Sequence, residues 1–154
     1  MQHVQLLIDG QSVDAANQAT FERISPIDGQ VVSVAAAATL EDVDRALESA
    51  SRAFQIWAKV SPTERRLRLL KAADLMDQNT EKFIEIGMRE TGSTATWYGF
   101  NVHLAANMLR EAAAMTTQID GSLIPSDVPG NLAMGIRVPC GVVVGIAPWN
   151  APVI

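Results

Sequence analysis

The residues best suited to chemistry lie near the end of the sequence, where an apolar run stops at Pro148-Trp149-Asn150. The run includes Val142-Val143-Val144, a β-branched pattern typical of a strand covered on both faces in a parallel sheet. Ligands of open α/β sheets bind at the carboxyl ends of such strands. There the Asn150 amide could donate to a developing oxyanion. It could equally cap a following helix, which the residue types alone favour.

Cys140 is the single cysteine of the 154 residues, which also contain two histidines. One thiol cannot form an intramolecular disulfide and this set is poor for zinc, so we predict no metal site and a cytoplasmic location. Cys140 lies between Pro139 and Gly141 at the start of the apolar run, with no neighbouring His, Lys or helix N-terminus in the sequence to activate it. We therefore expect a packed core thiol and not a nucleophile.

The composition and the motif search argue against several functions. Lys and Arg number 12 against 17 Asp and Glu, a formal charge of -5, and no basic cluster suggests a nucleic-acid partner. No window is long and apolar enough to span a membrane, and the N-terminus lacks the pattern of a secretory signal. The phosphate-loop, Cys-x-x-Cys, His-Glu-x-x-His and Gly-x-Ser-x-Gly patterns are absent. Gly141-x-x-x-Gly145 fails as a dinucleotide fingerprint because it lies inside the expected strand.

Turn and cap signals predict the elements that position this C-terminal end. Asp9-Gly10 and Asp28-Gly29, each between short apolar runs, predict β-hairpins. Thr39 with Asp42, and Ser61 with Pro62, predict two helix starts. Helices are expected over residues 40–57, 62–78, 83–92 and 95–118, followed by turns at 120–121 and 128–131 and strands over 132–138 and 141–147.

Two helices of this set carry apolar stripes at helical spacing. The first stripe, expected to be buried, is Leu40, Val43, Leu47, Ala50, Phe54 and Trp57. The second is Trp97, Phe100, Leu104, Met108, Ala112 and Met115. Such a stripe is more often helix core than a binding site.

The end of the sequence is unusual for a chain terminus. From Val138 to Ile154 no residue is charged, whereas termini are usually exposed and polar. A doubly wound α/β domain needs several more strand and helix units after its first strand. We therefore expect these residues to be the first part of a larger protein.

Six short motifs, collinear over almost the entire chain, resemble those of the aldehyde dehydrogenase superfamily. They are Asp9-Gly10, Ser25-Pro26-x-Asp28-Gly29, Phe54-x-x-Trp57, Arg65 at the start of a long helix, Glu90-Thr91-Gly92 and Pro148-Trp149-Asn150. The resemblance implies an α/β, aldehyde dehydrogenase-like fold. Residues 1–120 would supply N-terminal strands and helices of the cofactor-binding domain, 121–138 oligomerisation-type strands, and 139–154 the first buried strand of the Rossmann-like dinucleotide-binding sheet.

The resemblance also implies roles for individual residues. Asn150 matches the asparagine that donates to the thiohemiacetal oxyanion and is the catalytic candidate. The segment Ile146, Ala147, Pro148, Trp149 and Asn150 would line NAD, with NADP not excluded, and Trp97, Phe100, Leu104 and Met108 would line the aldehyde tunnel. Ala151 replaces an aromatic residue common in the family, which would open the substrate site to a flat aromatic aldehyde such as salicylaldehyde.

In that family a cysteine thiolate attacks the aldehyde, hydride passes to NAD(P)+, and a glutamate activates water to release the acid. Neither residue is placed in this sequence, so the chain alone is expected to be inactive. The resemblance also implies that the complete enzyme is a homodimer or homotetramer. Two alternatives stay open. The chain could be a non-catalytic interaction module derived from the same fold, or the enzyme could act on aliphatic aldehydes or semialdehydes.

Overall fold

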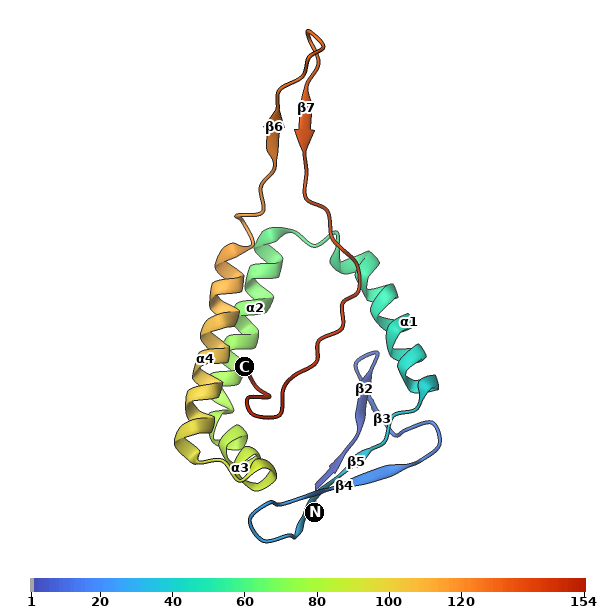
Figure 1. Ribbon diagram of the computed structural model, residues 1–154, viewed down its shortest axis with the longest axis vertical. Coiled ribbons are helices and arrows are strands. Elements are labelled where there is room, and N and C mark those ends of the chain that lie inside the picture. Colours follow the sequence, from blue (N-terminus) through green and yellow to red (C-terminus); the bar gives the residue numbers. More distant parts are fainter. Residues whose placement is uncertain (1) are drawn as a thin grey trace.

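A computed structural model describes residues 2–154. Figure 1 shows an open frame, with α2, α3 and α4 on one side, α1 on the other, short strands at the base and a projecting β6–β7 hairpin. The elements are β1 (Gln2–Val4), β2 (Leu6–Ile8), β3 (Gln11–Val13), β4 (Thr20–Ile24), β5 (Val31–Ala36), α1 (Leu40–Trp57), α2 (Pro62–Gln78), α3 (Thr80–Thr91), α4 (Ala95–Met115), β6 (Ser122–Ile124) and β7 (Ala133–Gly135).

The strands near the N-terminus form two small sheets. β2 and β3 pair antiparallel across a turn in which Asp9 and Gly10 both have positive φ, 56° and 73°, the geometry that favours Asp-Gly in tight hairpins. β5 lies between β4, which is antiparallel to it, and β1, which is parallel. Both predicted hairpins are confirmed.

The helix ends follow the predicted cap chemistry. The Thr39 hydroxyl accepts the Asp42 N–H, while the Asp42 carboxylate accepts the Thr39 N–H, so the capping box is complete. The Ser61 hydroxyl accepts the Glu64 N–H at 3.2 Å, and Pro62 occupies the first turn of α2. Gly92 ends α3 in the left-handed region with φ 71°. α4 begins at Ala95 as expected but ends at Met115, three residues short of the predicted Gln118.

The core lies where α4 packs against α2 and α3, and alanines form much of it together with Tyr98 and Val102. Ala105, Ala106 and Ala113 of α4 and Ala73 of α2 are buried, and short side chains let helix axes approach closely. Arg110 of α4 adds two ion pairs to α2, at 2.9 Å to Asp74 and 2.7 Å to Asp77.

The large apolar side chains of the predicted α4 stripe lie outside this core. On α4 the alanine face packs inward, so Trp97, Phe100, Met108 and Met115 are exposed and Leu104 is half-buried. The interpretation of that stripe as helix core is therefore wrong.

The stripe of α1 is also exposed. Along most of its length α1 stands apart from α2 and α4 (Figure 1), and Leu40, Val43 and Leu47 are exposed. At its end, Arg65 and Arg68 of α2 lie over the Trp57 ring, which still stays 40% exposed. The prediction of a buried stripe on α1 is wrong for this reason.

The C-terminal residues differ most from the expectations. β6 and β7 form an antiparallel hairpin, but β7 is limited to Ala133–Gly135 within the predicted 132–138. Residues 141–147 have no regular secondary structure and pair with no described strand. A strand needs neighbours for its hydrogen bonds, so the predicted buried strand is wrong here, and Val143, Val144 and Ile146 are exposed. The prediction of a packed core thiol is also wrong, because Cys140 is exposed.

No helix between residues 2 and 154 has the length and apolar character to cross a bilayer. Over the same residues, His, Cys, Asp and Glu side chains are nowhere gathered in threes at a metal-binding spacing.

Candidate functional site

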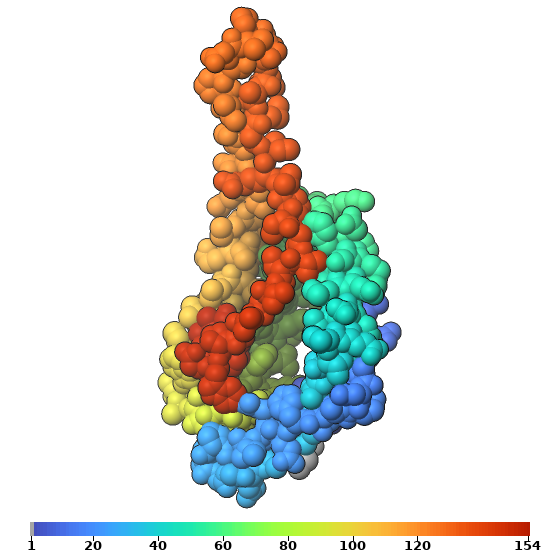
Figure 2. Space-filling view, turned by 45° about the vertical axis from the view of Figure 1, so that its right-hand side comes forward, coloured from blue at the N-terminus to red at the C-terminus, as the bar shows by residue number. Residues whose placement is uncertain are grey.

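Asn150 lies in a turn that the folded chain brings against the start of α4. The residues after Pro148 form this turn, here named the Asn150 turn (residues 149–152). In both whole-molecule views, Figures 1 and 2, the last residues return to the side of α3 and α4. The indole Nε1–H of Trp97 donates to the main-chain carbonyl of Asn150 at 3.2 Å. Two residues that the family resemblance placed in the site are thus in direct contact.

The neighbouring Trp149 is held from a different element. The guanidinium of Arg23, on β4, stacks over the Trp149 ring with its Cζ 4.1 Å from the ring centroid. Such a cation–π contact is attractive because the ring face carries partial negative charge. The Asn150 turn therefore lies between β4 and the first turn of α4, with one contact to each.

The aromatic part of the α4 stripe lies beside this turn. Trp97 and Phe100 pack with ring centroids 5.8 Å apart and planes tilted by 30°. With Thr94 and Thr96 they line a shallow surface hollow. Leu104 and Met108 follow at four-residue spacing along the same face of the helix. The structure therefore brings Trp97 to Asn150 directly and arranges the other predicted lining residues along one exposed face.

The Asn150 side chain itself is free. Among residues 2–154 its amide has no hydrogen-bond partner, and residues 151–154 form no helix that Asn150 would cap. Ile146 is 90% exposed, Trp149 is 57% exposed, and Ala147 and Pro148 are also exposed, whereas Ala151 is half-buried. This arrangement can offer a neutral N–H donor beside an uncharged apolar strip.

Two contacts connect the β4–β5 pair to α3, which packs against α4. The Ser33 hydroxyl on β5 donates to the Glu90 carboxylate on α3 at 2.9 Å. A Cβ placed on Gly92 would lie 3.0 Å from Pro26 Cγ, so the Ser25–Gly29 turn packs closely on the end of α3. Two of the predicted motifs thus meet, and their contact fixes β4 and β5 relative to α4.

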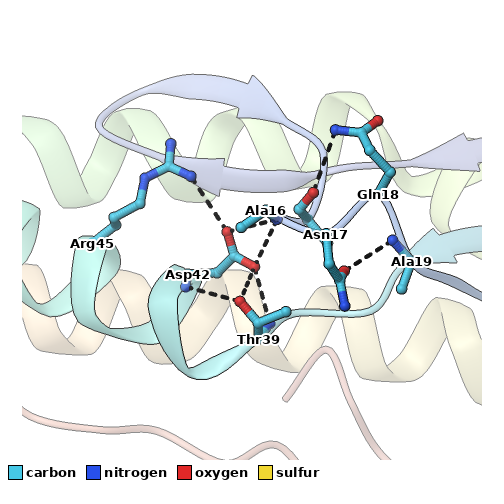
Figure 3. Close-up of polar contacts among 8 residues, drawn as sticks. Ala16, Asn17, Gln18, Ala19, Thr39, Asp42 and Arg45 are labelled. Atoms are coloured by element: carbon cyan, nitrogen blue, oxygen red, sulfur yellow. Dashed lines mark hydrogen bonds and ion pairs between the residues drawn. The ribbon is translucent and has the colours of Figure 1, made fainter.

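A buried carboxylate secures the other end of β4. Figure 3 shows Asp42, 1% exposed, accepting the Ala16 N–H at 3.1 Å and the Thr39 N–H at 2.9 Å, with Arg45 at 3.3 Å. The Thr39 N–H, then the Ala16 N–H, hold the pKa of Asp42 below its usual value, because they stabilise the charged form. In the same loop Asn17 accepts the Ala19 N–H at 3.0 Å. The cluster fixes the chain that enters β4.

Sequence reasoning missed Arg23. It lies 126 positions before Trp149 (149 minus 23), and no local pattern connects a strand arginine with a tryptophan so distant. The capping box pointed to Asp42, but its contact with Ala16 had no sequence signal.

Comparisons with known proteins show the family and the fold. Residues 13–154 match the family model described as the aldehyde dehydrogenase family. A vanillin dehydrogenase of Pseudomonas fluorescens is 61% identical over all of this chain and 32% of its own length. A salicylaldehyde dehydrogenase of Pseudomonas putida G7, solved in complex with salicylaldehyde, superposes with a TM-score of 0.96 at 43% identity, covering 99% of this chain and 32% of its own. An NAD-dependent aldehyde dehydrogenase of Sinorhizobium meliloti superposes with a TM-score of 0.93 at 32% identity. The match covers 99% of this chain and 31% of that enzyme.

The chain therefore belongs to the aldehyde dehydrogenase family and has its α/β fold. It spans about a third of the length of the curated relatives it matches (32%). The collinear motifs had predicted the family, and this prediction is confirmed. Ala151 had suggested the enzymes of aromatic aldehydes within it, and the chain is similar to vanillin and salicylaldehyde dehydrogenases.

Proposed function

We propose that this chain is the N-terminal part of an NAD(P)-dependent aldehyde dehydrogenase that oxidises aromatic aldehydes to carboxylic acids. The observation that carries the proposal is the contact between Trp97 and Asn150, because it joins an exposed aromatic face to a free amide donor. The similarity to vanillin and salicylaldehyde dehydrogenases supports the substrate class.

Asn150 is the proposed catalytic residue of this part. When a thiolate attacks the aldehyde carbon, the carbonyl oxygen gains negative charge, and an amide N–H held nearby stabilises it. The Asn150 amide suits this role because it is neutral and has no partner among the described residues. We propose that the thiolate comes from outside this chain and not from Cys140.

Ile146, Ala147, Pro148, Trp149 and Asn150 are the proposed contacts to the nicotinamide cofactor. Their side chains carry no charge, and the exposed surfaces of Ile146 and Trp149 fit a planar ring and not a phosphate. When bound, NAD or NADP accepts the hydride that leaves the aldehyde carbon. These residues would exclude water from that face and keep the Asn150 amide next to the reacting oxygen.

Trp97, Phe100, Leu104, Met108 and Ala151 are the proposed aldehyde contacts. The tilted pair of Trp97 and Phe100 offers ring faces and edges to a flat aromatic substrate. Alanine at 151 leaves room beside Asn150. The complete protein is expected to prefer salicylaldehyde or vanillin over propanal in kcat/KM. A preference for propanal would contradict this assignment.

The proposed role of Asn150 has a direct test in the complete protein. Asn150→Ala is expected to lower kcat by about a hundredfold to a thousandfold, the loss typical of one oxyanion donor. Asn107→Ala removes another exposed amide, on α4, and should leave kcat unchanged. Wild-type kcat in Asn150→Ala would contradict the role. Absence of NAD(P)-dependent oxidation of any aldehyde by the complete protein would favour the interaction module instead.

The 154-residue chain by itself is expected to be inactive, since the proposed nucleophile is not in it. Oxidation of an aldehyde by this chain alone would contradict that expectation.

We propose further that residues 121–138 join copies of the protein. The side chains of β6 are exposed, including Leu123 at 75%, and an uncovered hairpin edge is a natural place for another strand to pair. Light scattering on the complete protein is expected to give a dimer or tetramer. Leu123→Lys should reduce the molar mass of the oligomer, and an unchanged molar mass would place the interface elsewhere.

A further inference from the structure

The contact between Trp97 and Asn150 involves the main chain of Asn150 and not its side chain. Trp97 Nε1–H donates to the Asn150 carbonyl oxygen at 3.2 Å, which leaves the Asn150 amide free. Fixing the carbonyl restricts the backbone rotation that sets the direction of the Cα–Cβ bond. The direction of the amide donor therefore depends on Trp97.

The other side of the same turn is held by Arg23. Its guanidinium stacks on Trp149, the residue directly before Asn150. Asn150 is exposed and the residues before it have no regular secondary structure. In the described chain, Trp97 and Arg23 thus contact the Asn150 turn from two sides.

We propose that Trp97 is a positioning residue: its indole N–H fixes the Asn150 backbone and so aims the Asn150 amide at the reacting oxygen. This positioning role of the indole N–H is separate from the proposed contact between the Trp97 ring and the aldehyde. The inference rests on the proposed function, because it assigns Trp97 an effect that acts through Asn150.

The test uses Trp97→Phe in the complete protein, which keeps an aromatic ring against Phe100 and removes the N–H donor. Trp57→Phe is the matched control, because Trp57 is 40% exposed against 41% for Trp97 and lies at the end of α1, outside the proposed site. Trp97→Phe is expected to lower kcat by about twofold to tenfold, the value of one neutral hydrogen bond. The KM for the aldehyde should change little, and Trp57→Phe should change neither constant.

Combination with Asn150→Ala separates positioning from direct contact. If Trp97 acts through the Asn150 amide, Trp97→Phe causes no further loss of kcat in the Asn150→Ala background. An equal loss in both backgrounds, or wild-type kcat in Trp97→Phe alone, would overturn the inference while Asn150→Ala still showed its own loss. Wild-type kcat in Asn150→Ala would instead overturn the proposed function, and the inference with it.

A second measurement does not depend on activity. In the complete protein labelled with 15N-indole tryptophan, the Trp97 N–H is expected to exchange with solvent more slowly than the Trp57 N–H, because the two side chains are equally exposed. Each signal is assigned by its absence in the corresponding Phe variant. Equal exchange rates for the two indoles would mean that the hydrogen bond does not persist in solution, and would overturn the inference.

Discussion

Two regions of this chain show different ways of holding a residue in place. The framework (residues 2–115, β1–β5 and α1–α4) has its own paired strands, capped helices and a core between α2, α3 and α4. The C-terminal segment (residues 122–154) has one short hairpin and then no regular element. Yet the segment carries Asn150, and it is located by single contacts from the framework.

The comparison indicates that stability and proposed chemistry depend on different residues. Changes in the framework core should lower the free energy of unfolding with little effect on kcat, once the protein is folded. Changes at the Asn150 turn should lower kcat with little effect on unfolding. Asn150→Ala and Trp97→Phe test the expectation for the Asn150 turn. Substitutions at Gly87 and Asp42 test the expectation for the framework, and Arg23→Met tests the connection between the two regions.

The largest effect on stability is expected from Gly87→Ala. A Cβ at Gly87 would overlap the ring of Tyr98, which is 5% exposed where α3 packs on α4. Overpacking of this kind costs about 1–3 kcal/mol. The free energy of unfolding, measured by urea denaturation of the complete protein, should fall by that amount while kcat stays within twofold.

Gly99→Ala is the matched control for Gly87→Ala. A Cβ on Gly99 would meet Ile84 at 3.6 Å, an ordinary contact, and alanine favours a helix by up to about 1 kcal/mol over glycine. Gly99→Ala should therefore be neutral or stabilising. Equal destabilisation by both substitutions would show that the α3–α4 contact does not distinguish the two positions.

A smaller and pH-dependent effect is expected from Asp42→Asn. The asparagine oxygen can replace Oδ2, which accepts the Thr39 N–H, but the NH2 that replaces Oδ1 cannot accept from the Ala16 N–H or from Arg45. The negative charge is lost as well, so Tm should fall at neutral pH. The folded pKa of Asp42 lies below its ordinary 3.8. The carboxylate therefore stabilises the fold fully above about pH 4.5, and this contribution is lost as the pH falls through the lowered pKa.

The measurement is the difference in Tm between the wild type and Asp42→Asn as a function of pH. It should be constant from pH 8 to about pH 5 and shrink below pH 4. Asp44→Asn, at an exposed position of the same helix, should show no such difference. A gap that persisted unchanged to pH 2 would mean that the charge of Asp42 is not what stabilises the loop.

The same division explains what the sequence could predict. Thr39 with Asp42, Ser61 with Pro62, and Gly92 act on backbone groups within a few residues, so local chemistry was enough to predict their helix ends. The orientation of α4 was not predictable, because large side chains suggested one buried face while α2 packs on the alanine face. Val144 and Cys140 were expected inside, since β-branched runs are typically buried. Burial requires neighbouring strands that the described residues do not provide.

For the site, the end of the apolar run made Asn150 a candidate, whereas Trp97 was a site residue only through the family resemblance. No property of either motif gave the hydrogen bond between the Trp97 indole and the Asn150 carbonyl. Arg23 was missed entirely, because a cation–π contact with Trp149 depends on how β4 is placed relative to a turn far along the chain. Contacts between the two regions are therefore what sequence reasoning misses most.

The smallest effect, and the one that tests this connection, is expected from Arg23→Met. Methionine keeps an apolar side chain over Trp149 but removes the cation, whose contact with an exposed ring is worth about 0.5–1 kcal/mol. If losing the cation loosens the position of the Asn150 amide, kcat of the complete protein should fall by about twofold to threefold with Tm unchanged.

Arg52→Met is the control. It removes another exposed arginine, one that pairs with Asp9 at 3.6 Å on the far side of the framework, and should leave kcat unchanged. Equal kcat in both variants would mean that β4 does not help to position Asn150, and would leave Trp97 as the single contact through which the framework acts on it.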